Sequence, residues 1–295
     1  VNPSKIKTSI KNEGNIKTQN GIVTLKTDVA QSVVDDVIKT ENAKANGLVT
    51  ENGVVKLVTN SGTIKAKEIE IDAGAKGASE ISGTLNSNSE TEKGGNIEVT
   101  AKEIDINAAT ISADGKTGGG EILLGGDWQG SGSLLQATFL SIDNGSKISA
   151  DALQSGSGGK IVAWTNIKDL NSNTIVNGIL TAKGIDGAGG LIETSGASIN
   201  TDGIRVNAGS TSGPSGLWLI DPYDYTINSS AATNITNALN AGTNVTIQTS
   251  ANSSSFGSGG SSSGNGDITI TSNIGTTAGS ATSSTLTLTT SPTFI

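Results

Sequence analysis

A Gly-Gly pair followed by a short alternating strand occurs four times in the middle of this 295-residue chain. The four copies are Gly94-Gly95-Asn96-Ile97-Glu98-Val99, Gly119-Gly120-Glu121-Ile122-Leu123-Leu124, Gly158-Gly159-Lys160-Ile161-Val162-Ala163 and Gly189-Gly190-Leu191-Ile192-Glu193-Thr194. Apolar and polar residues tend to alternate within each copy, which is typical of a β-strand with one buried face. Such a short strand cannot bury its apolar face alone, so we expect the copies to stack on one another.

Two further patterns recur out of phase with the first. The second has aliphatic residues at its first and third positions and Asp or Asn at its fourth, and it occupies residues 69–73, 104–108, 140–144 and 204–208. The third places one aliphatic residue among small or polar ones. Its aliphatic residues are Ile64, Leu85, Ile111, Ile148, Leu180 and Ile199. Three kinds of strand in rotation, separated by turn-forming residues, predict an all-β chain that winds as a three-faced parallel β-helix.

The repeat pattern also predicts the interior and the length of this β-helix. The Ile, Leu, Val and Ala positions should point inward, and the Glu, Lys, Thr and Asn residues between them should point outward. A coil of about 22 residues would give about 13 coils. Strings of immunoglobulin-like sandwiches and a disordered linker are less consistent with this rotation of short strands.

The division of the chain follows from its composition. The repeats continue to about residue 210 without a charged or proline-rich linker. We therefore expect a β-helix shaft over residues 1–220 and further coils over 221–295, with a Ser/Gly-rich loop at 251–266. An N-cap candidate at Thr233 and a glycine at Gly242 predict one short helix near 233–241.

Charge and residue inventory limit the function. The net charge of -8 argues against nucleic acid or an anionic membrane as a partner, and the apolar runs are too short for membrane insertion. The chain has no His and no Cys, so it lacks the commonest general base and the usual zinc and iron ligands. Arg205 is the only Arg and lies in an ordinary repeat strand. We therefore predict a protein that is not an enzyme, with no catalytic residue and no cofactor.

Acidic residues near the predicted strand ends admit two interpretations. Asp72, Asp105, Asp143 and Asp186 could offer oxygen ligands to calcium. Aspartate at a coil corner also accepts hydrogen bonds from backbone groups, and this structural role is the stronger interpretation. No metal site is predicted.

Two sets of residues are candidates for surface recognition. The first set comprises aromatic side chains that could stack on the sugar rings of a glycan or contact a receptor: Trp128, Trp164, Trp218, Tyr223 and Tyr225. Burial of these large side chains against the shaft is the favoured alternative. The second set comprises glycosylation sequons at Asn144, Asn228, Asn234, Asn244 and Asn252, which chance also produces in a chain this rich in Asn, Ser and Thr.

Several segments, in their order along the chain, resemble the filamentous-haemagglutinin family of bacterial exoproteins, especially the high-molecular-weight adhesin branch secreted by the two-partner route. The segments are Gly125-Gly126-Asp127-Trp128-Gln129-Gly130, Gly159-Lys160-Ile161-Val162-Ala163-Trp164, Gly189-Gly190-Leu191-Ile192-Glu193-Thr194-Ser195-Gly196 and Leu217-Trp218-Leu219-Ile220-Asp221-Pro222-Tyr223-Asp224-Tyr225. The resemblance implies a right-handed β-helix with haemagglutinin-type repeats over residues 1–220. It also implies export through an outer-membrane transporter and a secreted or cell-surface location. It supplies no catalytic residues and does not identify a receptor.

The sequence thus leads to one expected function and two alternatives. We expect a non-catalytic stalk or adhesive segment of a large secreted, surface-associated bacterial exoprotein that attaches to host cells, matrix or other bacteria. Its partner would be a host or bacterial surface receptor, with glycans among the candidates. The alternatives are the delivery shaft of a contact-dependent toxin system and a β-helical polysaccharide-degrading enzyme. Val1 begins no signal-peptide pattern, so we expect an internal or mature fragment.

Overall fold

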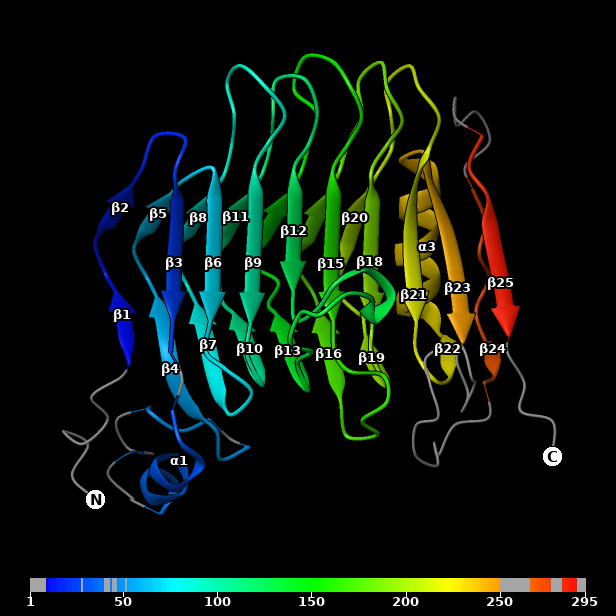
Figure 1. The fold of residues 1–295 in the computed structure, drawn as a ribbon. Coiled ribbons are helices and arrows are strands. Elements are labelled where there is room, and N and C mark those ends of the chain that lie inside the picture. Colours follow the sequence, from blue (N-terminus) through cyan, green and yellow to red (C-terminus); the bar gives the residue numbers. More distant parts are fainter. Residues whose placement is uncertain are drawn as a thin grey trace.

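Three parallel sheets wind around one core in the computed structural model, which describes residues 9–27, 29–39, 43, 47–50, 52–249, 266–276 and 283–290 (Figure 1). Successive strands belong to different sheets, so each strand pairs with the strand that occupies the same position one coil later. The chain is therefore a parallel β-solenoid, and the predicted fold class is confirmed.

The described residues form seven strands in each of sheets A and B and nine in sheet C. Sheet A comprises β1 (Ile10–Asn12), β4 (Val55–Asn60), β7 (Gly77–Ile81), β10 (Glu103–Ile106), β13 (Phe139–Ile142), β16 (Asn173–Val176) and β19 (Ser198–Asn200). Sheet B comprises β2 (Asn15–Lys17), β5 (Thr63–Lys65), β8 (Thr84–Asn86), β11 (Thr110–Ser112), β14 (Lys147–Ser149), β17 (Ile179–Thr181) and β20 (Arg205–Asn207). Sheet C comprises β3 (Ile22–Lys26), β6 (Glu68–Asp72), β9 (Asn96–Thr100), β12 (Glu121–Leu124), β15 (Lys160–Trp164), β18 (Leu191–Ser195), β21 (Gly216–Asp221), β23 (Thr243–Thr249) and β25 (Leu286–Thr290). A separate pair joins β22 (Tyr225–Ile227) to β24 (Ile268–Ile270).

The winding of the coils can be followed in Figure 1. Strands of sheet C point down at the front, strands of sheets A and B point up behind them, and the coils advance from left to right. A chain that descends in front, ascends behind and advances to the right follows a right-handed helix. This direction of winding agrees with the general preference of parallel β crossovers.

Apolar side chains stack in columns along the interior. In sheet C one column is in register from β3 to β25: Val23, Ile69, Ile97, Ile122, Ile161, Ile192, Trp218, Val245 and Leu286. Sheet B contributes a parallel column with Ile64, Leu85 and Ile111, all fully buried. Many of the positions between these on the outer face are polar, as the alternation predicted. Leu123 and Val162 of sheet C are exceptions: they point outward, although aliphatic residues were expected to point inward. Each coil thus completes the burial of its neighbour.

The Gly-Gly pairs mark the corner before each of four successive strands of sheet C, β9, β12, β15 and β18. A Cβ atom built on Gly159 would lie 2.0 Å from the carbonyl oxygen of Gly120 one coil earlier, and one built on Gly190 would lie 2.2 Å from the oxygen of Gly159. No real side chain fits at such separations. The glycines therefore allow the backbones of neighbouring coils to stack at this corner.

The three sequence patterns map unequally onto the three sheets. All copies of the Gly-Gly pattern lie in sheet C, whereas the second pattern is divided among β6 of sheet C, β10 and β13 of sheet A, and β20 of sheet B. The third pattern follows sheet B through Leu180, but its predicted last member, Ile199, lies in β19 of sheet A. Val206 takes the next place in the sheet B column. The second and third patterns do not reveal which sheet a strand joins, because strands of all three sheets require inward aliphatic side chains.

Among the described residues, two α-helices with defined bounds interrupt the strands. The predicted helix near 233–241 is α3 (Ser229–Asn240), which begins four residues earlier because Asn228, not Thr233, is the N-cap and its Oδ1 accepts a hydrogen bond from the Ala231 N–H (2.9 Å). Gly242 follows the helix with φ of +77°. Helix α3 packs against β20, β22 and β23, so it continues the face that sheet B occupies in earlier coils (Figure 1).

A second helix, α1 (Gln31–Ile38), was not predicted, and the expectation of one helix was wrong. It buries Val34 and Val37 against the core beside β4. Its four β-branched apolar residues, Val33, Val34, Val37 and Ile38, have low helix propensity and conceal the helical spacing.

Over the described residues, the coils are fewer and longer than predicted. Nine strands in sheet C, spaced by about 4.8 Å, give the described shaft a length of about 40 Å. The estimate of about 13 coils was wrong because loops such as the one between β12 and β13 lengthen individual coils. Sheet C runs through both predicted regions, 1–220 and 221–295. The predicted loop at 251–266 lies outside the described residues except for Gly266.

Candidate functional site

The loop between β12 and β13 folds over the outer face of sheet C and forms the most elaborate surface feature of the described shaft. Figure 1 shows this green loop crossing in front of β15 and β18. The loop contains a short 3-10 turn, η2 (Trp128–Gly130), whose N-cap Asp127 accepts a hydrogen bond from the Trp128 N–H (2.6 Å). The Gly-Gly-Asp-Trp-Gln-Gly segment of the sequence therefore builds a compact cover.

Trp164 is the residue that this loop covers. It lies at the end of β15 with 1% of its surface exposed, and its Nε1 donates to Oε1 of Gln136 (3.2 Å). Added Cβ atoms at Gly126 and Gly130 would each lie 2.5 Å from the indole ring. Both glycines also have positive φ, 152° and 62°. The loop thus needs glycine at these positions to close over the ring.

The covered side chains form a second hydrophobic cluster, separate from the core inside the coils. Its buried members are Leu123, Val162, Trp164, Ile167, Ala197 and Tyr223, with Trp128 and Leu134 packed at its edge. The cluster fixes three of the five candidate aromatic residues against the shaft. Burial of large apolar side chains of this kind stabilises the folded state by about 1.5–3 kcal/mol each.

A buried carboxyl group lies under the same loop. Glu193 of β18 is 0% exposed, and its side chain accepts hydrogen bonds from the Gln129 N–H (2.8 Å) and the Ser195 hydroxyl (2.8 Å). Burial raises the pKa of Glu193 to about 8, although the two hydrogen bonds lower it, and the charges of Asp221 and Asp127 raise it further. The protonated form of Glu193 therefore predominates in the folded protein at neutral pH.

Charged residues border the loop on the neighbouring coils. Lys160 forms ion pairs with Glu121 and with Asp127 (3.3 Å). Burial lowers the pKa of Lys160, but the hydrogen bond and charge of Glu121 outweigh that effect and the net shift is upward. Burial also raises the pKa of Glu98, and its neighbours Glu70 and Glu121 add to the shift. The outer face of sheet C therefore carries an acidic region whose charges are partly neutralised by Lys160.

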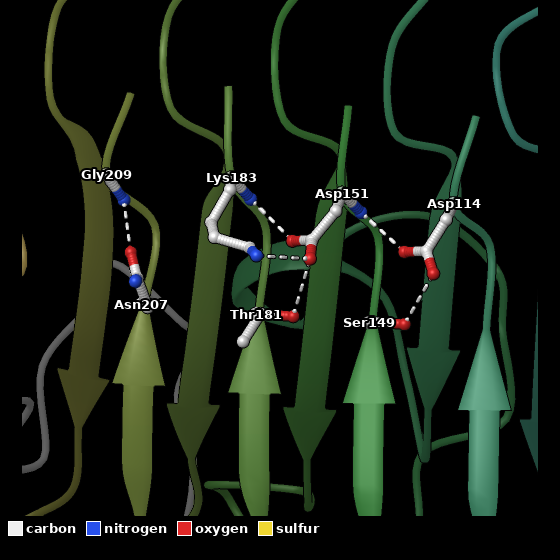
Figure 2. Close-up of polar contacts among 7 residues, drawn as sticks. All are labelled: Asp114, Ser149, Asp151, Thr181, Lys183, Asn207 and Gly209. Atoms are coloured by element: carbon white, nitrogen blue, oxygen red, sulfur yellow. Dashed lines mark hydrogen bonds and ion pairs between the residues drawn. The ribbon is translucent and has the colours of Figure 1, made fainter. Parts of the chain in front are cut away.

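A ladder of polar contacts holds the corner that follows sheet B (Figure 2). The Oδ1 atom of Asp114 accepts a hydrogen bond from the Asp151 N–H (2.7 Å), and the Oδ1 atom of Asp151 accepts one from the Lys183 N–H (2.7 Å). The ladder begins one coil earlier, where the Asn88 side chain accepts from the Asp114 N–H (2.7 Å). Each acidic or amide side chain thus satisfies the backbone of the next coil.

Hydroxyl and ammonium groups complete this corner ladder. The Oδ2 atom of Asp114 accepts from Ser149 (2.9 Å), and the Oδ2 atom of Asp151 accepts from Thr181 (3.1 Å) and forms an ion pair with Lys183 Nζ (3.2 Å). Burial is the largest effect on the pKa of Asp114 and raises it. Figure 2 shows these contacts running across successive coils, so the ladder contributes to stacking.

Three of the four candidate calcium ligands take the structural role that the sequence favoured, whereas Asp105 lies within β10. Asp72 and Asp143 accept hydrogen bonds at coil corners from the Gly74 and Ala108 N–H groups (both 2.8 Å), and Asp186 accepts from the Gly156 N–H. No group of three or more His, Cys, Asp or Glu side chains placed to hold a metal ion is found in the described ranges. Within the same ranges, neither helix has the length and apolar character needed to cross a bilayer.

The structure does not bring the five candidate aromatic residues together in one exposed platform. Trp164, Tyr223 and Trp128 share the covered cluster, whereas Trp218 (0% exposed) and Tyr225 belong to the core inside the coils. The Nε1 atom of Trp218 donates to Thr194 (3.1 Å), and the hydroxyl of Tyr225 contacts that of Thr201 (2.9 Å). Only Trp128 is more than slightly exposed. This burial favours the packing interpretation of the aromatic residues.

The sequons differ in how their asparagines are engaged. Asn144 is exposed at a coil corner. Asn228 caps α3, Asn234 donates to the backbone oxygen of Thr201 (2.7 Å), and Asn244 accepts from the Thr285 N–H (2.8 Å). Asn252 lies outside the described residues. Asn144 and Asn228 are both exposed, and glycosylation at the sequons stays a prediction.

Sequence reasoning missed the two polar features with the clearest geometry. Glu193 occupies an outward position of a regular strand, and nothing local indicates that a loop 64 residues earlier in the chain covers it. Asn88, Asp114, Asp151 and Lys183 each lie two residues beyond a strand of sheet B. A search for polar residues at that fixed offset could have found the ladder.

A scan of the chain against models of known protein families found no matching family, and a search of curated proteins found no significant match.

Proposed function

We propose that this chain is a non-catalytic stalk and adhesive segment of a secreted, surface-associated bacterial exoprotein. The observation that carries the proposal is the uninterrupted interior column of sheet C, in which nine side chains from nine strands are in register. A core of this kind makes the coils depend on one another, so the shaft resists bending while it displays polar side chains on its surface.

Membership of the filamentous-haemagglutinin family is part of the same proposal. It is supported by the order of the motifs and by the parts that they play in the fold. The Gly-Gly-Asp-Trp-Gln-Gly segment covers Trp164. The Gly-Gly pairs form the corner that precedes four strands of sheet C. Export through an outer-membrane transporter of the two-partner type and attachment to a host or bacterial surface receptor follow from this membership.

An adhesion assay tests the proposal. Beads coated with the purified chain are presented to epithelial cells, matrix proteins and bacteria, and beads coated with the heat-denatured chain serve as the control. On at least one of these surfaces, we expect more beads to be retained when they carry the folded chain than when they carry the denatured chain. Equal retention of folded and denatured coatings on all of them would contradict the adhesive part, and measurable cleavage of a polysaccharide by the chain would contradict the non-catalytic part.

A further inference from the structure

A groove of about 450 Å³ crosses the outer face of sheet A. Its floor is formed by Glu103 of β10, Phe139 of β13 and Asn173 of β16, which are in register on three successive coils. These residues alternate with inward residues such as Ile104 and Leu140, so their side chains share the outer face. The groove therefore runs along the shaft and not across a single strand.

Two loops form the walls of this groove. At the amino-terminal side, the turn that carries Asn52 is fixed to the floor by a hydrogen bond from the Thr50 hydroxyl to Oε2 of Glu103 (2.7 Å). At the other side, the loop after β15 contributes Asp169 and Asn171. Both walls thus come from segments that are far apart in the sequence.

The second wall is rigid because hydrogen bonds within the loop organise it. Oδ1 of Asp169 accepts from the backbone N–H of Asn171 (3.0 Å), and the Ser172 N–H donates to the Asp169 carbonyl oxygen (2.8 Å). The Ser172 hydroxyl in turn accepts from the Ala197 N–H (3.1 Å). A preformed wall lowers the entropy cost of binding a ligand.

The chemistry of the lining suits a polyhydroxylated ligand. Asn52, Asn171 and Asn173 offer amide donors and acceptors, and Asp169 offers a carboxylate acceptor. Phe139 is half-buried and supplies an apolar surface beside them. A sugar ring presents hydroxyl groups at its edge and C–H groups on its faces, and small pockets that combine polar groups with an aromatic ring match both features.

We propose that this groove binds a neutral glycan, with Phe139 against a sugar face and Asp169, Asn171 and Asn173 as hydrogen-bond partners of its hydroxyl groups. This inference rests on the proposed adhesive function and names its ligand class. The groove differs from the set of aromatic residues predicted from the sequence, which did not include Phe139.

Charge at the groove selects among glycans. Glu103 and Asp169 place two carboxylates in the lining, against the single ammonium group of Lys102. The whole chain carries a net charge of -8. Sialylated and sulfated sugars would meet net repulsion at this surface, so neutral sugars are the better match.

Saturation-transfer NMR with the whole chain tests the assignment directly. The probes are lactose, N-acetyllactosamine and mannobiose as neutral sugars, with sialyllactose and a sulfated heparin disaccharide as acidic ones. Phe139→Leu removes the aromatic ring but keeps an apolar side chain, and Asn173→Ala removes an amide. Leu153→Ala alters an apolar side chain that is 55% exposed and outside the groove, and it serves as the control.

We expect saturation transfer to at least one neutral sugar at millimolar concentration, binding about tenfold weaker in Phe139→Leu and Asn173→Ala, and no change in Leu153→Ala. Stronger transfer to the acidic sugars, no transfer to any neutral sugar, or full binding in both groove variants would overturn the inference. If coated beads still adhere to cells while no neutral sugar binds, the groove assignment fails and the adhesive function stands. If neither occurs, both fail.

Discussion

At the scale of single residues, the glycine pairs show how closely the coils approach one another. A Cβ atom on Gly159 would lie 2.0 Å from the Gly120 carbonyl oxygen and 2.8 Å from the Cβ of Ala150. The neighbouring backbone would have to move, and such overpacking costs about 1–3 kcal/mol. We therefore expect Gly159→Ala to lower the midpoint of urea denaturation clearly.

Gly275→Ala is the matched control for this substitution, because no atom lies within 4 Å of its added Cβ. It should leave the midpoint nearly unchanged. Equal effects of the two substitutions would show that the corner tolerates a side chain, which the stacking geometry does not allow.

Glu193 makes stability depend on pH. Its pKa rises from the ordinary 4.5 to about 8 on folding, so between these values the folded state holds a proton that the unfolded state releases. The free energy of unfolding therefore falls as pH rises through this window and levels off above about pH 8, by about 2–4 kcal/mol in all. We expect Glu193→Gln, which resembles the protonated acid, to remove most of this dependence in denaturation measured from pH 5 to pH 8.5.

Glu90→Gln changes an exposed carboxylate and should leave the pH profile of the wild type in place. A wild-type protein that becomes more stable from pH 5 to pH 8, with the same trend in Glu193→Gln, would show that the carboxyl group under the loop is ionised.

At the scale of elements, the corner ladder ties sheet B of one coil to the next. Asp151 is 8% exposed and accepts hydrogen bonds from both the backbone of Lys183 and the hydroxyl of Thr181. Asp151→Ala leaves these donors without their acceptor, which costs about 1–3 kcal/mol. Thermal denaturation should show this loss, and Asp267→Ala, at an exposed aspartate, should have little effect. A loss as small as that of the control would mean that water replaces the ladder without cost.

The elements also show what a sequence of this kind reveals and what it conceals. The Gly-Gly pattern identified the corner before sheet C correctly because the backbones of neighbouring coils approach so closely there that no side chain fits. The second pattern was distributed over three sheets because alternating aliphatic residues suit every face of the coil. Helix α1 was missed because its apolar residues are β-branched, as they are in the strands.

The polar sites were harder to predict than the fold for a physical reason. Glu193 owes its burial to Gln129, and Glu103 owes its place in the groove to Phe139, Asn173 and two distant loops. These contacts depend on how many residues each loop inserts between coils, and the spacing of the repeats is irregular. The interior needs only an aliphatic residue at each inward position of a coil, whereas a surface site needs particular loops to lie side by side.

At the scale of the whole molecule, rigidity and display of surface groups arise from the same repetition. Each coil buries aliphatic residues on its neighbours and leaves its outward positions free to vary, so loops and grooves can differ from coil to coil without disturbing the core. The covered cluster on sheet C and the groove on sheet A are two such local elaborations. This separation of a constant interior from a variable exterior suits an adhesive shaft.

Distances between spin labels along one face test the central claim most directly. The chain has no Cys, so pairs of introduced cysteines report only the chosen positions. One in-register row of sheet B contains Asn15, Thr63, Thr84 and Arg205. Arg205 lies six coils from Asn15, five coils from Thr63 and four coils from Thr84. The account predicts narrow distributions centred near 29, 24 and 19 Å, in steps of about 4.8 Å per coil. Broad distributions, or separations that do not decrease by one strand spacing at each step, would contradict a rigid shaft of stacked parallel coils.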